Sequence, residues 1–324
     1  MNLRSNKEYL TNENNPEDPE WVQSYENQEQ PEIKDSPDMP KHKKLMSRIK
    51  FATLKERFDE RAIRSGVDPD TLNFLDANRI YAQWGVKSEA MYIREGNYIV
   101  MDYVEIENTA RRIGVDPELF AVLIMIHEQL HAASKFKFKG LREAHAAGLK
   151  GDYTIEDQVG YGSSKTVQKM GQKTYESYFR MFDEGINEKL AREIILEYLE
   201  SHPDFTDAEK IDQFRQVYQD EHKYKSYELQ VFFINKLITK LSVETGVSEN
   251  AVWEALVRGK FEGEDFSSDE VKDLFSETFS SDFLDKLSKI NNVEQGRKLV
   301  ELLKHTEIKK TGKLKNLVGK IRNY

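Results

Sequence analysis

The sequence predicts an α+β fold that is mostly helical. Three observations carry this prediction: two short apolar runs on either side of Glu95-Gly96, a long apolar segment that begins at Asp116-Pro117, and helical apolar periodicity in most of the chain after Pro203. The first observation has the pattern of a β-hairpin, whereas the other two have the length and period of helices. We therefore expect a short antiparallel sheet followed by helices.

The composition is that of a water-soluble globular protein. The chain has 324 residues, of which 38% are hydrophobic and 32% are charged, and this length allows one or two domains with a sizeable core. Its longest wholly apolar run, residues 119–126, is too short to span a membrane. The polar residues 2–7 do not resemble the start of a signal peptide.

Two further features of the composition narrow the function. The absence of cysteine excludes disulfides, thiol catalysis and cysteine-ligated zinc, and it agrees with a cytoplasmic location. A net charge of −9 argues against nucleic acid as a partner, because affinity for phosphates comes largely from clustered Lys and Arg. Histidine and carboxylate side chains are then the expected metal ligands.

Four regions follow from the pattern of charge and hydrophobicity. Residues 1–44 are polar, acidic and proline-bearing, which predicts a disordered extension. Residues 45–203 should form the core that carries the chemistry, and residues 204–305 a helical subdomain. Residues 306–324 form a basic tail, for which a solvated helix end is the simplest interpretation.

The elements of the core are expected in the order hairpin, helix, helix. Residues 90–94 and 97–101 flank the turn residues Glu95-Gly96 and predict a β-hairpin. Asp116 is a suitable N-cap and Pro117 suits the first helical position, so a helix should begin there. The apolar residues that follow indicate that this helix is mostly buried.

The buried helix carries the most informative motif of the chain, His127-Glu128-Gln129-Leu130-His131. Residues i and i+4 share one helical face, so the imidazoles of His127 and His131 can reach one Zn²⁺. Glu128 lies about 100° round the helix, where it can serve as the general base for a metal-activated water. Two histidines of a buried helix could instead be core residues with ordinary hydrogen-bond partners, but this spacing favours a shared metal.

A third ligand is expected downstream, on a helix that begins near residue 182. Glu184 and Glu188 lie four residues apart there, and the sequence Asp-Glu-Gly-Ile-Asn-Glu-x-Leu-Ala at 183–191 resembles the Asn-Glu-Gly-x-x-Glu-x-Leu segment of gluzincin metallopeptidases. The resemblance implies that Glu184 is the third zinc ligand and that Glu188 orients a ligating histidine. A rival alignment on Ile-Asn-Glu makes Glu188 the ligand, but it leaves Arg192 where the orienting acid should stand.

The resemblance implies a zincin-like catalytic core, in which a short sheet precedes the motif helix and its edge strand binds an extended peptide. The expected function is therefore zinc-dependent hydrolysis of a peptide or protein substrate, with Glu128 as catalytic base and His127, His131 and Glu184 as metal ligands. The long interval between His131 and Glu184 departs from the family pattern. Candidates for the group that stabilises the oxyanion are Tyr227, Tyr224, His222 and Tyr178.

Two alternatives stay open at this point. The chain could be a regulatory protease that acts on one protein partner, with Glu188 as the third ligand. It could also be a non-catalytic helical interaction protein whose zinc site is structural or degenerate. A structural site has no use for Glu128, which favours the enzymatic hypotheses.

Overall fold

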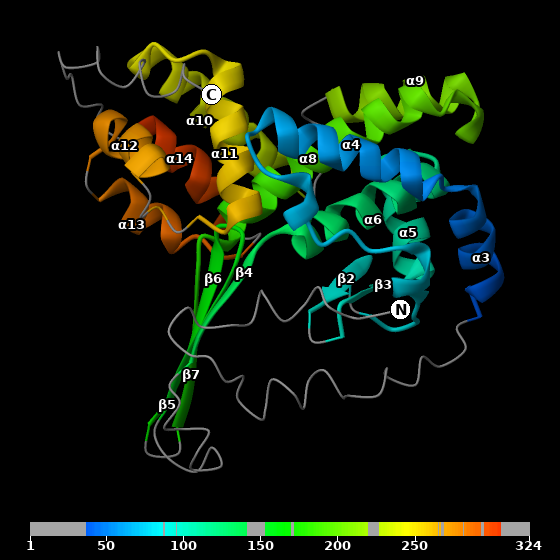
Figure 1. The fold of residues 1–324 in the computed structure, drawn as a ribbon, viewed down its shortest axis with the longest axis horizontal. Helices are drawn as coiled ribbons and strands as arrows, with labels where there is room; N and C mark the ends of the chain where they lie inside the picture. The colour runs from blue at the N-terminus through cyan, green and yellow to red at the C-terminus, as the bar shows by residue number, and fades with distance from the viewer. Residues whose placement is uncertain are drawn as a thin grey trace.

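The computed structural model describes residues 37–86, 88–94, 96–140, 153–169, 172–219, 227–264, 266, 269–280, 282–292 and 295–305. Within these residues the chain is mostly helical, with one sheet of three strands and one of four (Figure 1). This confirms the predicted α+β, mostly α class. Most of the expected extension (residues 1–36) and the basic tail from residue 306 lie outside the described residues.

The folded part begins earlier than the sequence suggested. Helix α3 spans Met39–Arg48, so residues 39–44, which we expected to be disordered, are helical. The reason is a buried anchor: the His42 ring nitrogens lie 3.0 Å from the Tyr103 hydroxyl and 3.0 Å from the Ile80 carbonyl oxygen. Helix α4, Phe51–Arg64, follows and packs against the core.

The predicted hairpin is present in the first sheet. Strands β2 (Ala90–Ile93) and β3 (Tyr98–Met101) pair antiparallel, with Met91 opposite Val100. A third strand that we did not predict, β1 (Ile80–Ala82), pairs parallel to β3 on its other side. Strand β2 therefore lies at one edge of this sheet.

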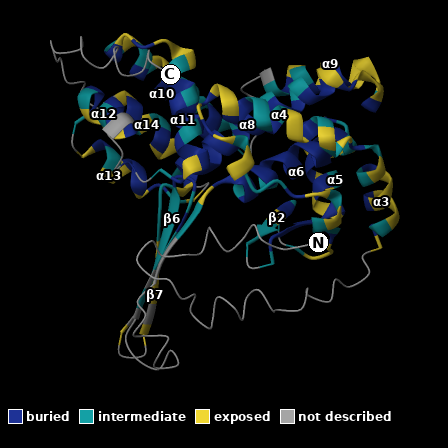
Figure 2. Cartoon of the chain, viewed as in Figure 1, coloured by how far each residue is buried: buried dark blue, intermediate teal, exposed yellow. Residues whose placement is uncertain are grey.

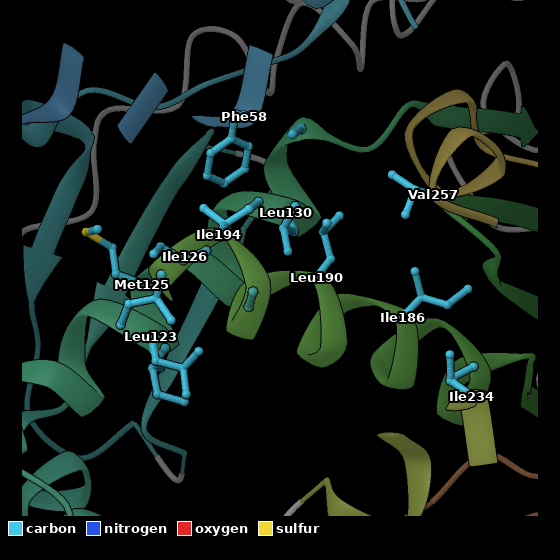
Figure 3. Packing of buried hydrophobic residues seen from close by; sticks show 14 of the residues in the cluster. Phe58, Leu123, Met125, Ile126, Leu130, Ile186, Leu190, Ile194, Ile234 and Val257 are labelled. Carbon is cyan, nitrogen blue, oxygen red and sulfur yellow. The ribbon is translucent and has the colours of Figure 1, made fainter. Parts of the chain in front are cut away.

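The motif helix starts where the sequence predicted. Helix α6 spans Pro117–Ala133 and follows helix α5 (Tyr103–Ile113), and the Asp116 side chain accepts hydrogen bonds from the backbone N–H groups of Glu118 and Leu119. Nearly every residue of α6 is buried. It packs against α8 (Arg180–Ser201), which is the second helix that the sequence predicted. Figure 3 shows the shared apolar core, with Phe58, Leu123, Met125, Ile126, Leu130, Ile186, Leu190, Ile194, Ile234 and Val257.

An antiparallel sheet is inserted between these two helices. Its strands are β4 (Phe136–Gly140), β5 (Tyr153–Val159), β6 (Gly162–Lys169) and β7 (Gln172–Tyr178), paired in that order. It projects from the helical body (Figure 1), and most of its described residues are partly exposed, with the exposed ones near its outer end (Figure 2). Residues 160 and 161 form the turn between β5 and β6.

Most of the described residues after Pro203 are helical, as the periodicity predicted. The helices are α9 (Ala208–Gln219), α10 (Glu228–Thr245), α11 (Glu249–Glu262), α12 (Asp269–Thr278), α13 (Phe283–Ser288) and α14 (Gly296–His305). Helices α10 and α11 both pack on α8, and their buried residues belong to the same hydrophobic cluster as those of α6. Among the described residues, no helix has the length and hydrophobicity needed to cross a membrane.

Gly185 is needed where α8 meets α10. A Cβ at this position would lie 2.9 Å from Ile234 Cγ1 and 3.1 Å from the Gln230 carbonyl oxygen. Helix propensity favours alanine over glycine by about 1 kcal/mol, but the overlap opposes it. We expect Gly185→Ala to lower the free energy of unfolding by about 1–3 kcal/mol, the usual effect of overpacking. Urea unfolding measures this, and a variant as stable as the wild type would show that α10 can move away freely.

Candidate metal centre

The three residues of the motif lie together on α6. The ligand atoms of His127, Glu128 and His131 are within 4.8 Å of one another, so this group could hold a metal ion. The two imidazole centroids are 5.2 Å apart. This arrangement follows directly from the i, i+4 spacing on a regular helix.

Helix α8 brings Glu184 to both histidines. Glu184 Oε2 lies 3.1 Å from His127 Nε2 and 3.6 Å from His131 Nε2. One carboxylate oxygen therefore faces Nε2 of both rings. It belongs to Glu184, the residue that we predicted as the third ligand.

The other nitrogen of each ring faces a different carboxylate. Glu188 Oε2 lies 3.1 Å from His127 Nδ1, and Asp183 Oδ2 lies 3.9 Å from His131 Nδ1. Both carboxylates are buried, and each pairs with a cation: Arg192 Nε is 2.8 Å from Glu188 Oε1, and Lys260 Nζ is 2.7 Å from Asp183 Oδ2. Carboxylates at this position fix the tautomer and direction of a metal-bound imidazole.

Sequence reasoning missed Asp183 and Lys260. Asp183 directly precedes Glu184 in the segment that resembles gluzincins. This position beside a predicted ligand was the one sequence feature that could have identified it. Lys260 is 77 positions from Asp183 and belongs to α11, and nothing in the local pattern of α11 marks it as part of the site. A fully buried lysine is rare unless it is paired, and here the Asp183 carboxylate supplies the pair.

The pKa values reflect this concentration of buried charge. Burial lowers the pKa of His127, but its hydrogen bonds to Glu184 and Glu188 outweigh burial and raise that pKa to about 10. Burial raises the pKa of Glu184, but His131 and His127 outweigh it and hold that pKa well below its ordinary value. Burial likewise acts against the ionised form of Glu188, whose pKa is nevertheless lowered, chiefly by the charge of Arg192. The site thus favours ionised carboxylates that face a positive group.

The Glu128 carboxylate lies within 4.8 Å of the ligand nitrogens of both histidines, and it also contacts the edge of the first sheet. The backbone N–H of Tyr92 in β2 donates to Glu128 Oε2 over 2.7 Å. The general base that the motif predicts therefore has its carboxylate fixed by the edge strand. Glu184 and Glu128 come from different helices.

One of the four candidates for an oxyanion stabiliser lies against the histidines. The Tyr227 ring, at the start of α10, stacks on His127 with centroids 5.3 Å apart. The Tyr178 hydroxyl instead donates to Glu176 on the projecting sheet. Tyr224 and His222 lie outside the described residues.

Comparisons of the chain with models of protein families, with curated proteins and with solved structures found no match. The metal-site hypothesis therefore depends on the residues and geometry of this chain alone.

The metal-free protein should have a pH-dependent stability that reports the His127–Glu184 interaction. A raised histidine pKa stabilises the fold fully below the ordinary value of 6.5, and this contribution is lost as the pH rises through about 10. A lowered carboxyl pKa stabilises it fully above the ordinary value of 4.5, and this contribution is lost as the pH falls. The interaction should therefore contribute most between pH 4.5 and 6.5.

Urea unfolding of chelator-treated wild type and Glu184→Gln across this range measures the effect. The difference in free energy of unfolding between the two proteins should shrink as the pH rises from 6.5 toward 10. A difference that does not change with pH would contradict the assigned pKa of His127.

Proposed function

We propose that this protein is a zinc-dependent peptidase of the gluzincin type. His127, His131 and Glu184 would hold the zinc, and Glu128 would act as the general base. The observation that carries the proposal is the shared carboxylate: Glu184 faces the Nε2 atoms of both histidines, whereas a separate buried carboxylate faces each Nδ1.

The chemistry of these residues fits zinc. Two imidazole nitrogens and one carboxylate oxygen form the donor set of catalytic zinc sites, which leave a further position for water. Charge supports the same assignment. Among the buried partners of the two histidines, Asp183 is paired with Lys260 and Glu188 with Arg192, so Glu184 adds a negative charge at the centre of the group. Arg180 approaches Glu184 only to 3.9 Å and its side chain is 63% exposed, so it compensates this charge weakly.

A bound Zn²⁺ would lower the pKa of its water and polarise the carbonyl under attack. Glu128 would accept the proton from the attacking water and then deliver it to the leaving amine. Before substrate binds, the Tyr92 N–H would hold the Glu128 carboxylate beside the edge strand. Strand β2, at the edge of its sheet, would hold an extended peptide beside Glu128 by backbone hydrogen bonds.

The alternative in which Glu188 is the ligand, as in a regulatory protease, has less support. Its carboxylate lies on the Nδ1 side of His127, is completely buried, and is already bound to Arg192. For Glu188 and His127 Nε2 to bind one metal, the His127 ring would have to turn over and lose its contact with Glu184. The non-catalytic alternative leaves the fixed position of Glu128 without a role.

Replacing the base should separate metal binding from catalysis. We expect Glu128→Gln to retain about one zinc per chain and to lose peptidase activity by a factor of about 10²–10⁴, the usual contribution of a general base. Zinc content and hydrolysis of a mixed peptide library, measured on both proteins, test this. Wild-type protein that binds zinc but cleaves no peptide would support a non-catalytic site, and an active Glu128→Gln would exclude the proposed mechanism.

Replacing the two acids of α8 should distinguish ligand from orienting group. Glu184→Ala should abolish stoichiometric zinc binding, because it removes a direct ligand. Glu188→Ala should retain zinc with affinity reduced about 10–100-fold, as expected when an orienting carboxylate is lost. Zinc titration against a competing chelator measures both, and the opposite ranking of the two variants would identify Glu188 as the ligand.

A further inference from the structure

We propose that the projecting sheet controls the orientation of His131, and therefore metal affinity, through Asp183. The inference builds on the proposed function, because it requires that His131 bind a metal. We use the name "root" for Gln158, Gly160 and Tyr161, the residues at the turn between β5 and β6 that join this sheet to the helical body.

Asp183 connects the root to the metal centre. Its Oδ1 atom accepts a hydrogen bond of 2.9 Å from the backbone N–H of Tyr161. Its Oδ2 atom accepts from Lys260 Nζ and lies 3.9 Å from His131 Nδ1. The same small carboxylate thus contacts the projecting sheet, helix α11 and a histidine of the motif, so a shift of the root must move the group that faces His131.

The root is fixed tightly enough to set the position of Asp183. The Tyr161 hydroxyl donates to the Leu256 carbonyl oxygen over 3.1 Å, and Gln158 Nε2 donates to the carbonyl oxygens of Gly160 and Gly263 over 2.9 Å each. Tyr161 is 1% exposed and packs against Phe182 and Phe266. These bonds leave the backbone N–H of Tyr161 directed at Asp183.

The two histidines differ in what their orienting carboxylates depend on. Glu188, beside His127, pairs with Arg192 four residues along the same helix, so this support is internal to α8. Asp183, beside His131, depends on Lys260 of α11 and on Tyr161 of the inserted sheet. His131 is therefore the ligand whose orientation responds to the position of the sheet.

Two glycines of the turn provide a matched test. A Cβ on Gly160, whose φ is +57°, would lie 2.6 Å from Asp183 Oδ1 and 2.6 Å from Lys260 Cδ, so alanine there must displace this pair. A Cβ on Gly162 would meet Val159 O at 3.5 Å and Asp183 Cβ at 3.6 Å, which is ordinary contact. Gly160 lies in the turn and Gly162 begins β6, and neither substitution removes a side chain from the metal centre.

The experiment measures binding of Co²⁺ to the full chain by competition with a chelator, together with the absorption spectrum of the bound Co²⁺. We expect Gly160→Ala to weaken binding about tenfold, as loss of an orienting carboxylate does, and to change the spectrum. Gly162→Ala should leave both unchanged. The spectrum distinguishes a change in ligand geometry from a general loss of stability, which circular dichroism monitors in parallel.

Asp183→Asn gives an independent measurement should Gly160→Ala fail to fold. It keeps the size of the side chain but removes the charge beside His131, and it should weaken Co²⁺ binding by a similar factor. Wild-type affinity and spectrum in both Gly160→Ala and Asp183→Asn would overturn the inference while leaving the metal site intact. Wild-type protein that binds no Co²⁺ or Zn²⁺ would instead contradict the proposed function.

Discussion

The carboxylate of Glu184, buried between two imidazole nitrogens, is the interaction on which the rest of the site depends. A buried negative charge is costly unless a positive group faces it. Helices α6 and α8 must therefore pack in the register that places Glu184 opposite both His127 and His131. Gly185, the next residue, allows α10 to approach α8 closely, and the start of α10 brings Tyr227 onto the His127 ring. The apolar packing of these helices and the polar site are consequently parts of one arrangement.

The same constraint explains the two buried ion pairs. His127 is buried and presents Nε2 to Glu184, so its Nδ1 also needs a partner, because an unpaired buried N–H would cost free energy. Glu188 meets this need at 3.1 Å, whereas Asp183 lies 3.9 Å from Nδ1 of the partly exposed His131. Both carboxylates would be unpaired buried charges without Arg192 and Lys260. Lys260 is completely buried. The fold tolerates this because the ammonium group pairs with Asp183 and because the β5–β6 turn covers the pair. The inserted sheet therefore completes the polar interior as well as extending from the body.

The parts of the fold that could be predicted are those encoded locally. A few neighbouring residues were enough to predict the Asp116 cap, the apolar helix that follows it and the hairpin around Glu95-Gly96. The inserted sheet is less evident: β4 alternates aromatic and basic residues, but β6 consists mainly of polar residues, and alternation arises only where one side of a strand is covered. A short motif drew attention to Glu184, whereas the ion pair of its neighbour Asp183 with Lys260 joins residues 77 positions apart and depends on tertiary packing.

Under the proposed function, the resting contact of Glu128 links substrate binding to catalysis. The Tyr92 N–H that fixes Glu128 belongs to the edge strand along which an extended peptide would bind. One backbone N–H cannot fully serve both a carboxylate and a substrate carbonyl, so a peptide that pairs at this position would compete with Glu128 for its donor. The carboxylate released in this way would be free to accept a proton from the attacking water. Substrate binding and activation of the base would then be coupled through a single hydrogen bond of the edge strand.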